Sequence, residues 1–114
     1  MTNIKMLYDN NLYCGFEMEG HADYNPGGPD VICASLSAAS QMTVNGILDW
    51  IGVDFDDIVK LNNPRKGFLK IIIPSPMHES ITVQQMFKSF ELYVSMLSDM
   101  YAENITVERR EGDD

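Results

Sequence analysis

The sequence has few basic residues: eight Lys and Arg stand against seventeen Asp and Glu, which gives a net charge of −9. Proteins that bind nucleic acids need clustered Lys and Arg to contact the phosphates, and here the basic residues are scattered. The composition therefore argues against direct contact with nucleic acid. An acidic surface attracts basic peptides and proteins instead, although the same charge also serves simply to keep a small domain soluble.

The sequence also lacks a run of about 18 apolar residues, the length of a membrane-spanning helix. Residues 1–8 contain no apolar stretch of the length found in secretory signals. Only two cysteines are present, Cys14 and Cys33, and free thiols are expected in a chain without an export signal. These features predict a cytoplasmic protein with no membrane segment.

The length of 114 residues and the apolar fraction of 45% predict a single folded domain. A chain of this size buries a core without disulfides or a structural metal. We expect the domain to span residues 1–110 and the polar residues 111–114 to form a frayed tail.

The first half of the chain predicts two strands followed by a helix. Residues 3–8 and 12–19 are expected to form a hairpin, and the second strand alternates between two faces. Its apolar face carries Leu12, Cys14, Phe16 and Met18. Residues 22–29 hold two prolines and two glycines and predict a loop. A helix is then expected from an N-cap at Asp30 to a stop at Gly52.

The second half predicts two strands at 53–61 and 68–73, a helix at 79–101 and a short strand at 105–107. The apolar stripe of this second helix is wide, which favours deep burial or a subunit interface. The resulting order is ββαββαβ. We therefore predict an α+β fold in which two helices pack on a mainly antiparallel sheet.

Cys33 is the first candidate for chemistry, because Asp30 as N-cap would place it in the first turn of a helix. The unpaired N–H groups and the positive end of the helix dipole stabilise a thiolate there. The same N–H groups can stabilise an oxyanion that forms on a substrate carbonyl. The position therefore favours a nucleophilic cysteine, although most lone cysteines are inert and buried.

His21 is the candidate base. It lies twelve positions before Cys33, and the loop between them is long enough to bring the two side chains together. Asp30 or Asp23 could orient the imidazole, and the sequence does not choose between them. A purely capping role for Asp30 remains open. Ser37 shares a helix face with Asp30 and Cys33.

The other candidates give weaker signals. Cys14 lies on the apolar face of a strand and is expected in the core. His78 has no partner nearby in the sequence and is expected at the surface. A metal site at His21, His78 and Asp23 matches no known ligand spacing. Neither a metal nor a cofactor is therefore predicted.

One segment carries a specific motif: Gly20-His21-Ala22, then Gly28, then Asp30-Val31-Ile32-Cys33-Ala34, and then Ser37. It resembles the signature of the ribosomal-processing cysteine protease family, Prp. That signature is Gly-His-Ala, a variable loop, Gly-x-Asp, two apolar residues, Cys-Ala, and a serine four positions after the cysteine. Outside residues 20–37 the chain agrees in length and element order only.

The resemblance implies a cytoplasmic, homodimeric α+β thiol protease that removes the N-terminal extension of a large-subunit ribosomal protein during ribosome assembly. His21 and Cys33 match the catalytic dyad of the family. The other motif positions are matched by Gly20, Asp30 and Ser37. The loop before the cysteine is expected to move, and its Gly27-Gly28 pair suits a hinge.

Two alternatives use the same sequence features. One is a non-catalytic dimeric binding module in ribosome assembly. The other is a thiol hydrolase that acts on a small thioester. A protease should have a reactive Cys33 and a binding module should not. A protease and a thiol hydrolase differ in the substrates that they cleave.

Overall fold

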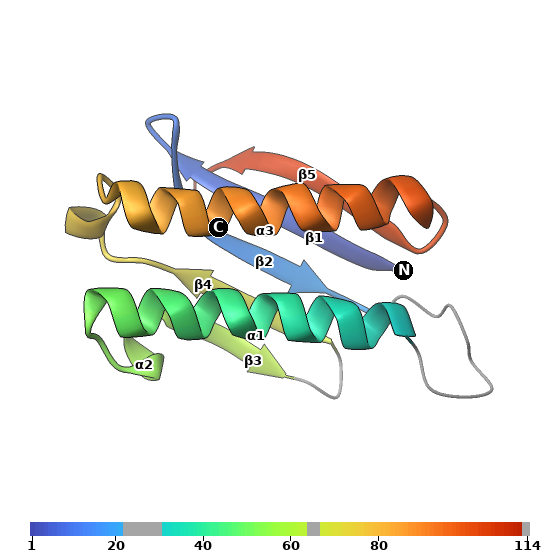
Figure 1. Ribbon diagram of the computed structural model, residues 1–114, viewed down its shortest axis with the longest axis horizontal. Helices are drawn as coiled ribbons and strands as arrows, with labels where there is room; N and C mark the ends of the chain where they lie inside the picture. Colours follow the sequence, from blue (N-terminus) through green and yellow to red (C-terminus); the bar gives the residue numbers. More distant parts are fainter. Residues whose placement is uncertain (22–30, 64–66, 113–114) are drawn as a thin grey trace.

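The computed structural model describes residues 1–21, 31–63 and 67–112. Two long helices lie side by side on one face of a five-stranded sheet (Figure 1). This arrangement confirms the predicted α+β fold with helices packed on a sheet. The elements are, in chain order, β1 (Thr2–Asp9), β2 (Leu12–Glu19), α1 (Val31–Ile51), α2 (Phe55–Ile58), β3 (Val59–Asn63), β4 (Phe68–Ile72), the short 3₁₀ helix η1 (Ser75–Met77), α3 (Ile81–Met100) and β5 (Ile105–Glu111).

The sheet is mixed, which the sequence analysis did not predict. Its strand order is β3-β4-β2-β1-β5. Three neighbouring pairs are antiparallel, whereas β1 and β5 are parallel. The reason is α3, which runs back along the whole sheet so that β5 starts at the same end as β1 (Figure 1). A parallel pair needs such a long connection.

The predicted order ββαββαβ is wrong between α1 and β3, because α2 precedes the strand. The sequence analysis assigned residues 53–61 to a strand, but only the last part of this segment is extended. The Asp54 N–H donates to the Asp57 carboxylate at 2.9 Å. This bond is one half of a capping box, the signal for a helix start. The result is one helical turn, which shortens β3 to Val59–Asn63.

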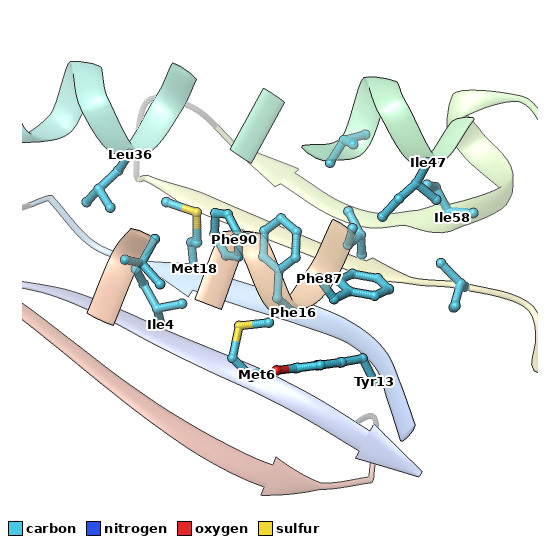
Figure 2. Packing of buried hydrophobic residues seen from close by; sticks show 14 of the residues in the cluster. Ile4, Met6, Tyr13, Phe16, Met18, Leu36, Ile47, Ile58, Phe87 and Phe90 are labelled. Carbon is cyan, nitrogen blue, oxygen red and sulfur yellow. The ribbon is translucent and has the colours of Figure 1, made fainter. Parts of the chain in front are cut away.

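The core lies between the sheet and the two long helices (Figure 2). Phe16 of β2 stacks on Phe90 of α3, with ring centroids 4.3 Å apart. Leu36 and Ile47 fill the core from α1. The predicted apolar stripe of α3 is confirmed, since its side chains are buried at helical spacing. These buried positions are Val83, Phe87, Phe90, Val94 and Leu97.

The alternation predicted for β2 fails at Tyr13. A register shift in the β1–β2 pair brings Tyr13 to the helix side, where its hydroxyl donates to the Glu91 carboxylate of α3. Arg109 of β5 donates to the same carboxylate at 2.9 and 3.0 Å, and the Tyr8 hydroxyl lies 3.3 Å from it. We call these four residues the Glu91 cluster. Glu91 is only 8% exposed.

The Glu91 carboxylate is charged and buried, and its partners stabilise the charge. Burial alone would raise the pKa of Glu91, but the hydrogen bonds from Arg109 and Tyr13 outweigh it and hold the pKa below the ordinary value. Burial, followed by the contact with this carboxylate, raises the pKa of Tyr13. The cluster therefore ties α3 to β1, β2 and β5 through a permanently ionised group at neutral pH.

The predicted frayed tail at residues 111–114 is wrong for its first two residues. Glu111 belongs to β5, and the Gly112 N–H donates to the Tyr8 carbonyl at 2.8 Å. Pairing with β1 explains why Glu111 is part of a strand, because the parallel register continues as far as Tyr8 and Glu111. Residues 113 and 114 lie outside the described part of the chain.

Candidate active site

A pocket of about 610 Å³ opens between α1 and the β2–β4–β3 side of the sheet. His21 follows the end of β2, and Cys33 lies near the start of α1. Both line this pocket, as do Gly20 and Ser37. The structure therefore brings four of the residues singled out in the sequence to one place. Asp23, Asp30 and the hinge glycines Gly27 and Gly28 lie outside the described residues, so their roles stay predictions.

Cys33 is the third residue of α1, which begins at Val31. The predicted helix is confirmed from Val31 onward, with the cysteine in its first described turn; the predicted N-cap at Asp30 lies outside the described residues. The N–H groups of a first helical turn point toward the start of the helix, where the helix dipole is positive. Cys33 is partly buried and packs against the core. Its thiol is therefore held in place near the positive end of the helix dipole.

His21 is exposed and is positioned by the backbone around Gly20. The Gly20 N–H donates to the Gly67 carbonyl at 3.1 Å, and the Gly20 carbonyl accepts from the Thr2 hydroxyl at 3.3 Å. Gly20 has φ +91°, and a Cβ at this position would lie 2.4 Å from the Met1 carbonyl oxygen. Only glycine fits such a position. Steric crowding therefore explains why the residue before His21 in the motif is a glycine.

Gly67 is a site residue that the sequence analysis did not identify. It has φ +71°, and a Cβ there would lie 2.4 Å from the Gly20 carbonyl oxygen and 3.3 Å from Cε1 of His21. The imidazole of His21 therefore lies against this glycine. Gly67 falls between the strands predicted at 53–61 and 68–73, and no sequence signal places it beside a residue so far away in the chain.

The pocket is apolar with polar but uncharged groups at its rim. None of the described residues that line it is Asp, Glu, Lys or Arg. Gln41 donates to the Ser37 hydroxyl at 2.9 Å, one and two turns along α1 from Cys33. The distance from Cys33 to Asn45 along the helix is about 18 Å at 1.5 Å per residue, enough for about five residues of an extended peptide. The pocket is therefore shaped for a chain segment as well as for a small molecule.

The remaining candidates lie elsewhere. Cys14 is 3% exposed, as predicted for a core residue. The surface position predicted for His78 is wrong: it is buried, with Nε2 3.2 Å from the Ile73 carbonyl and Nδ1 3.7 Å from Asp9. Asp9 ends β1, whereas Gly20 lies against its start, so His21 and His78 cannot share a metal. Among residues 1–21, 31–63 and 67–112, no cluster of three metal-binding side chains occurs.

A cysteine in the first turn of a helix that shares a pocket with a histidine is an arrangement found in cysteine-dependent hydrolases. The family model of the cysteine protease Prp matches residues 1–106, and the chain belongs to this family. No curated protein matches the chain closely enough to count as a relative.

Solved structures share the fold. The ribosomal processing protease Prp from S. aureus, with a covalently linked product peptide, has a TM-score of 0.78 at 22% identity, and the match covers 96% of this chain and 100% of that chain. The same protease with a substrate peptide gives 0.73 at 21% identity, with the same coverage. SMU.848 from Streptococcus mutans gives 0.79 at 23% identity, over 98% of this chain and 96% of that chain.

Proposed function

We propose that this chain is a cysteine endopeptidase in which Cys33 is the nucleophile and His21 the general base. The observation that carries the proposal is that both side chains line one pocket, with Cys33 in the first turn of α1. Membership of the cysteine protease Prp family supports it. The neutral lining of the pocket also supports it, because no carboxylate among the described lining residues opposes the thiolate.

The proposed reaction runs in two steps. His21 takes the thiol proton, and Sγ of Cys33 attacks the carbonyl carbon of the scissile peptide bond. N–H groups of the first turn of α1 stabilise the oxyanion. His21 then gives the proton to the leaving amine, and water hydrolyses the resulting thioester with His21 again as base. Ser37, bonded to Gln41 at the pocket rim, is proposed as a supporting residue.

The proposed substrate is the N-terminal extension of a large-subunit ribosomal protein, removed in the cytoplasm during ribosome assembly. The S. aureus relative described above is a ribosomal processing protease and was solved with peptides. Ribosomal proteins are basic, and a chain of net charge −9 attracts them over long range. If this attraction guides the substrate, kcat/KM falls as ionic strength rises. Cleavage that is insensitive to salt would contradict the steering role alone.

The decisive test is cleavage of a peptide that spans the ribosomal extension, with Cys33→Ala and His21→Ala compared to the wild type. We expect kcat to fall by about 10⁴-fold or more in either variant. Cys14→Ala is the matched control, because Cys14 is the other thiol and lies buried away from the pocket; its kcat should stay at the wild-type level. Turnover retained in Cys33→Ala contradicts the mechanism. Equal, slow iodoacetamide labelling of Cys33 and Cys14 in the wild type favours a non-catalytic binding module instead.

A thiol hydrolase of small thioesters uses the same two residues. The length of the pocket along α1 favours a peptide over a small thioester. The same assay with an acetyl thioester in place of the peptide separates the two, because a peptidase should prefer the peptide in kcat/KM.

A further inference from the structure

The pocket of the candidate active site has one end that the proposed chemistry does not use. His21 and Cys33 lie near the start of α1, whereas Asn45, further along the helix, and Phe55 of α2 line the other end of the same pocket. Much of the described lining is apolar, and it includes Met18, Leu36, Val44, Phe68 and Leu69. A peptide that reaches Cys33 along α1 therefore also meets an apolar wall.

Phe55 is exposed although it belongs to a firmly anchored element. Its side chain is 45% exposed, and its neighbours in the sequence are Asp54 and Asp56. Ile58, the last residue of α2, is fully buried in the core. At the other end of the turn, the Asp54 N–H donates to the Asp57 carboxylate at 2.9 Å. These anchors hold Phe55 at the pocket wall, and a rigid element positions a contact side chain better than a loop does.

Two distances place Phe55 about four or five peptide residues from the reacting bond. Along α1, the step from Cys33 to Asn45 is about 18 Å at 1.5 Å per residue. Along the sheet, β3 runs from α2 back to the end where Gly67 lies against His21 (Figure 1). Its five residues span about 13 Å at 3.3 Å per residue. An extended peptide advances by the same amount per residue, so both lengths correspond to about four or five residues.

The chemistry of this wall favours an apolar side chain of the peptide. The ring of Phe55 offers apolar contact, and the described residues that line the pocket include no Asp, Glu, Lys or Arg. A polar side chain placed against the ring would lose water and gain no hydrogen bond from it. An apolar side chain would remove its own surface and that of Phe55 from water.

We propose that Phe55 is a specificity-determining residue that binds an apolar side chain of the peptide four or five residues from the cleaved bond. The proposal rests on the cysteine-peptidase function and adds the class of substrate to it: a peptide with an apolar residue at that separation. Phe55 lies far from the reacting atoms, so its contact contributes to binding of the peptide and not to the chemical step.

The test measures the coupling between Phe55 and the peptide. Peptides that span the ribosomal extension carry either Leu or Ser at one position at a time, on both sides of the cleaved bond. For the wild type we expect kcat/KM to be about tenfold higher with Leu than with Ser at one position four or five residues from the bond, the low end of the range for a small apolar group in a hydrophobic pocket. In Phe55→Ala this preference should fall to about twofold or less, and the loss should appear in KM.

Leu61→Ala is the matched control. Leu61 of β3 is exposed to nearly the same degree as Phe55, 43% against 45%, but it does not line the pocket. This variant should keep the wild-type preference at every position of the peptide. Phe55→Leu keeps an apolar side chain and should retain most of the preference. Urea denaturation checks that each variant folds, and the peptide series on the wild type decides by itself if Phe55→Ala does not fold.

Each other outcome overturns the proposal or the function on which it rests. Cleavage that depends on Cys33 but shows no preference for Leu four or five residues from the bond overturns the role of Phe55 and leaves the peptidase intact. A preference that persists in Phe55→Ala, or that is lost equally in Leu61→Ala, does the same. Failure of the peptidase itself is seen separately, as turnover retained in Cys33→Ala.

Discussion

The two ends of the sheet are held together by different means. At the end that carries the β1–β2 turn, side chains make the connections. The Glu91 cluster joins α3 to three strands, and Gln84 of α3 forms hydrogen bonds with both the N–H and the carbonyl of Tyr13. At the opposite end, backbone groups make most of them. Gly20 contacts Gly67 and Met1 through carbonyl and N–H groups, and the Thr2 hydroxyl donates to the Gly20 carbonyl.

This difference separates stability from chemistry. The buried charge of Glu91 is satisfied by its own partners at the end of the sheet that carries no candidate catalytic residue. The end with His21 and Cys33 has no charged residue among the described lining residues of its pocket. Among the described residues that line the pocket with Cys33, the positive end of the α1 dipole is therefore the main electrostatic influence on the thiol. Backbone packing also leaves the side chains there available to a substrate.

The largest loss of stability is expected from Gly20→Ala, which disrupts the backbone contacts at the end of the sheet that carries His21. The added Cβ would collide with the Met1 carbonyl oxygen, 2.4 Å away, at a positive φ. We expect a loss of about 2–4 kcal/mol in the free energy of unfolding, the range for strained core substitutions, and a loss of peptide cleavage because His21 is displaced. Chemical denaturation and the peptide assay measure both.

Gly52→Ala is the control, since Gly52 also has a positive φ of +71° but nothing lies within 4 Å of an added Cβ. It should cost only about 1 kcal/mol from backbone strain and leave cleavage unchanged. Equal losses in the two variants would mean that the contact with Met1 does not matter.

The next largest loss of stability is expected from Glu91→Gln, which disrupts the Glu91 cluster at the opposite end of the sheet. The substitution removes the charge that accepts from Arg109 and Tyr13, and it should cost roughly 1.5–3 kcal/mol at pH 7. Because the pKa of Glu91 is lowered in the folded chain, this stabilisation is fully present above the ordinary pKa of glutamate. It is lost as the pH falls through the lower folded pKa. Urea denaturation at pH 7 and at progressively lower pH measures it.

The stability difference between wild type and Glu91→Gln should therefore shrink on acidification. Asp99→Asn, an exposed carboxylate on the same helix, is the control and should change stability by less than about 0.5 kcal/mol. A difference that stays constant down to acidic pH would contradict the role of the ionised carboxylate. Cleavage per folded molecule should be unaffected by Glu91→Gln, because the cluster and the pocket lie at opposite ends.

The smallest change in stability is expected from Gln41→Ala, at the pocket rim. Its exposed hydrogen bond to Ser37 joins residues one helical turn apart and is worth about 0.2–0.5 kcal/mol. Gln41 and Ser37 both line the pocket, so KM for the peptide should change more than stability does. Gln85→Ala, which removes a similar bond to Ser89 outside the pocket, should leave KM unchanged. Equal KM values in the two variants would exclude a role for Gln41 at the site.

The sequence analysis succeeded where the signals are local. The helix that carries Cys33 near its start and the apolar stripe of α3 follow from helical periodicity, and the structure confirms them. It failed at α2, where strand propensity hid the capping signal of Asp54 and Asp57. It failed at Tyr13 because a bulge shifts the alternation of β2, and at His78 because its partners come from distant segments.

By itself, the sequence determined the two long helices, the place of Cys33 near the start of the first of them and a motif specific enough to point to one protease family. These depend on residues within a few positions of one another. Only the tertiary structure decided that Gly67 lies against His21, that Glu91 joins three strands and that Phe55 lines the pocket of Cys33. Such contacts depend on strand order and register, which short-range patterns do not specify.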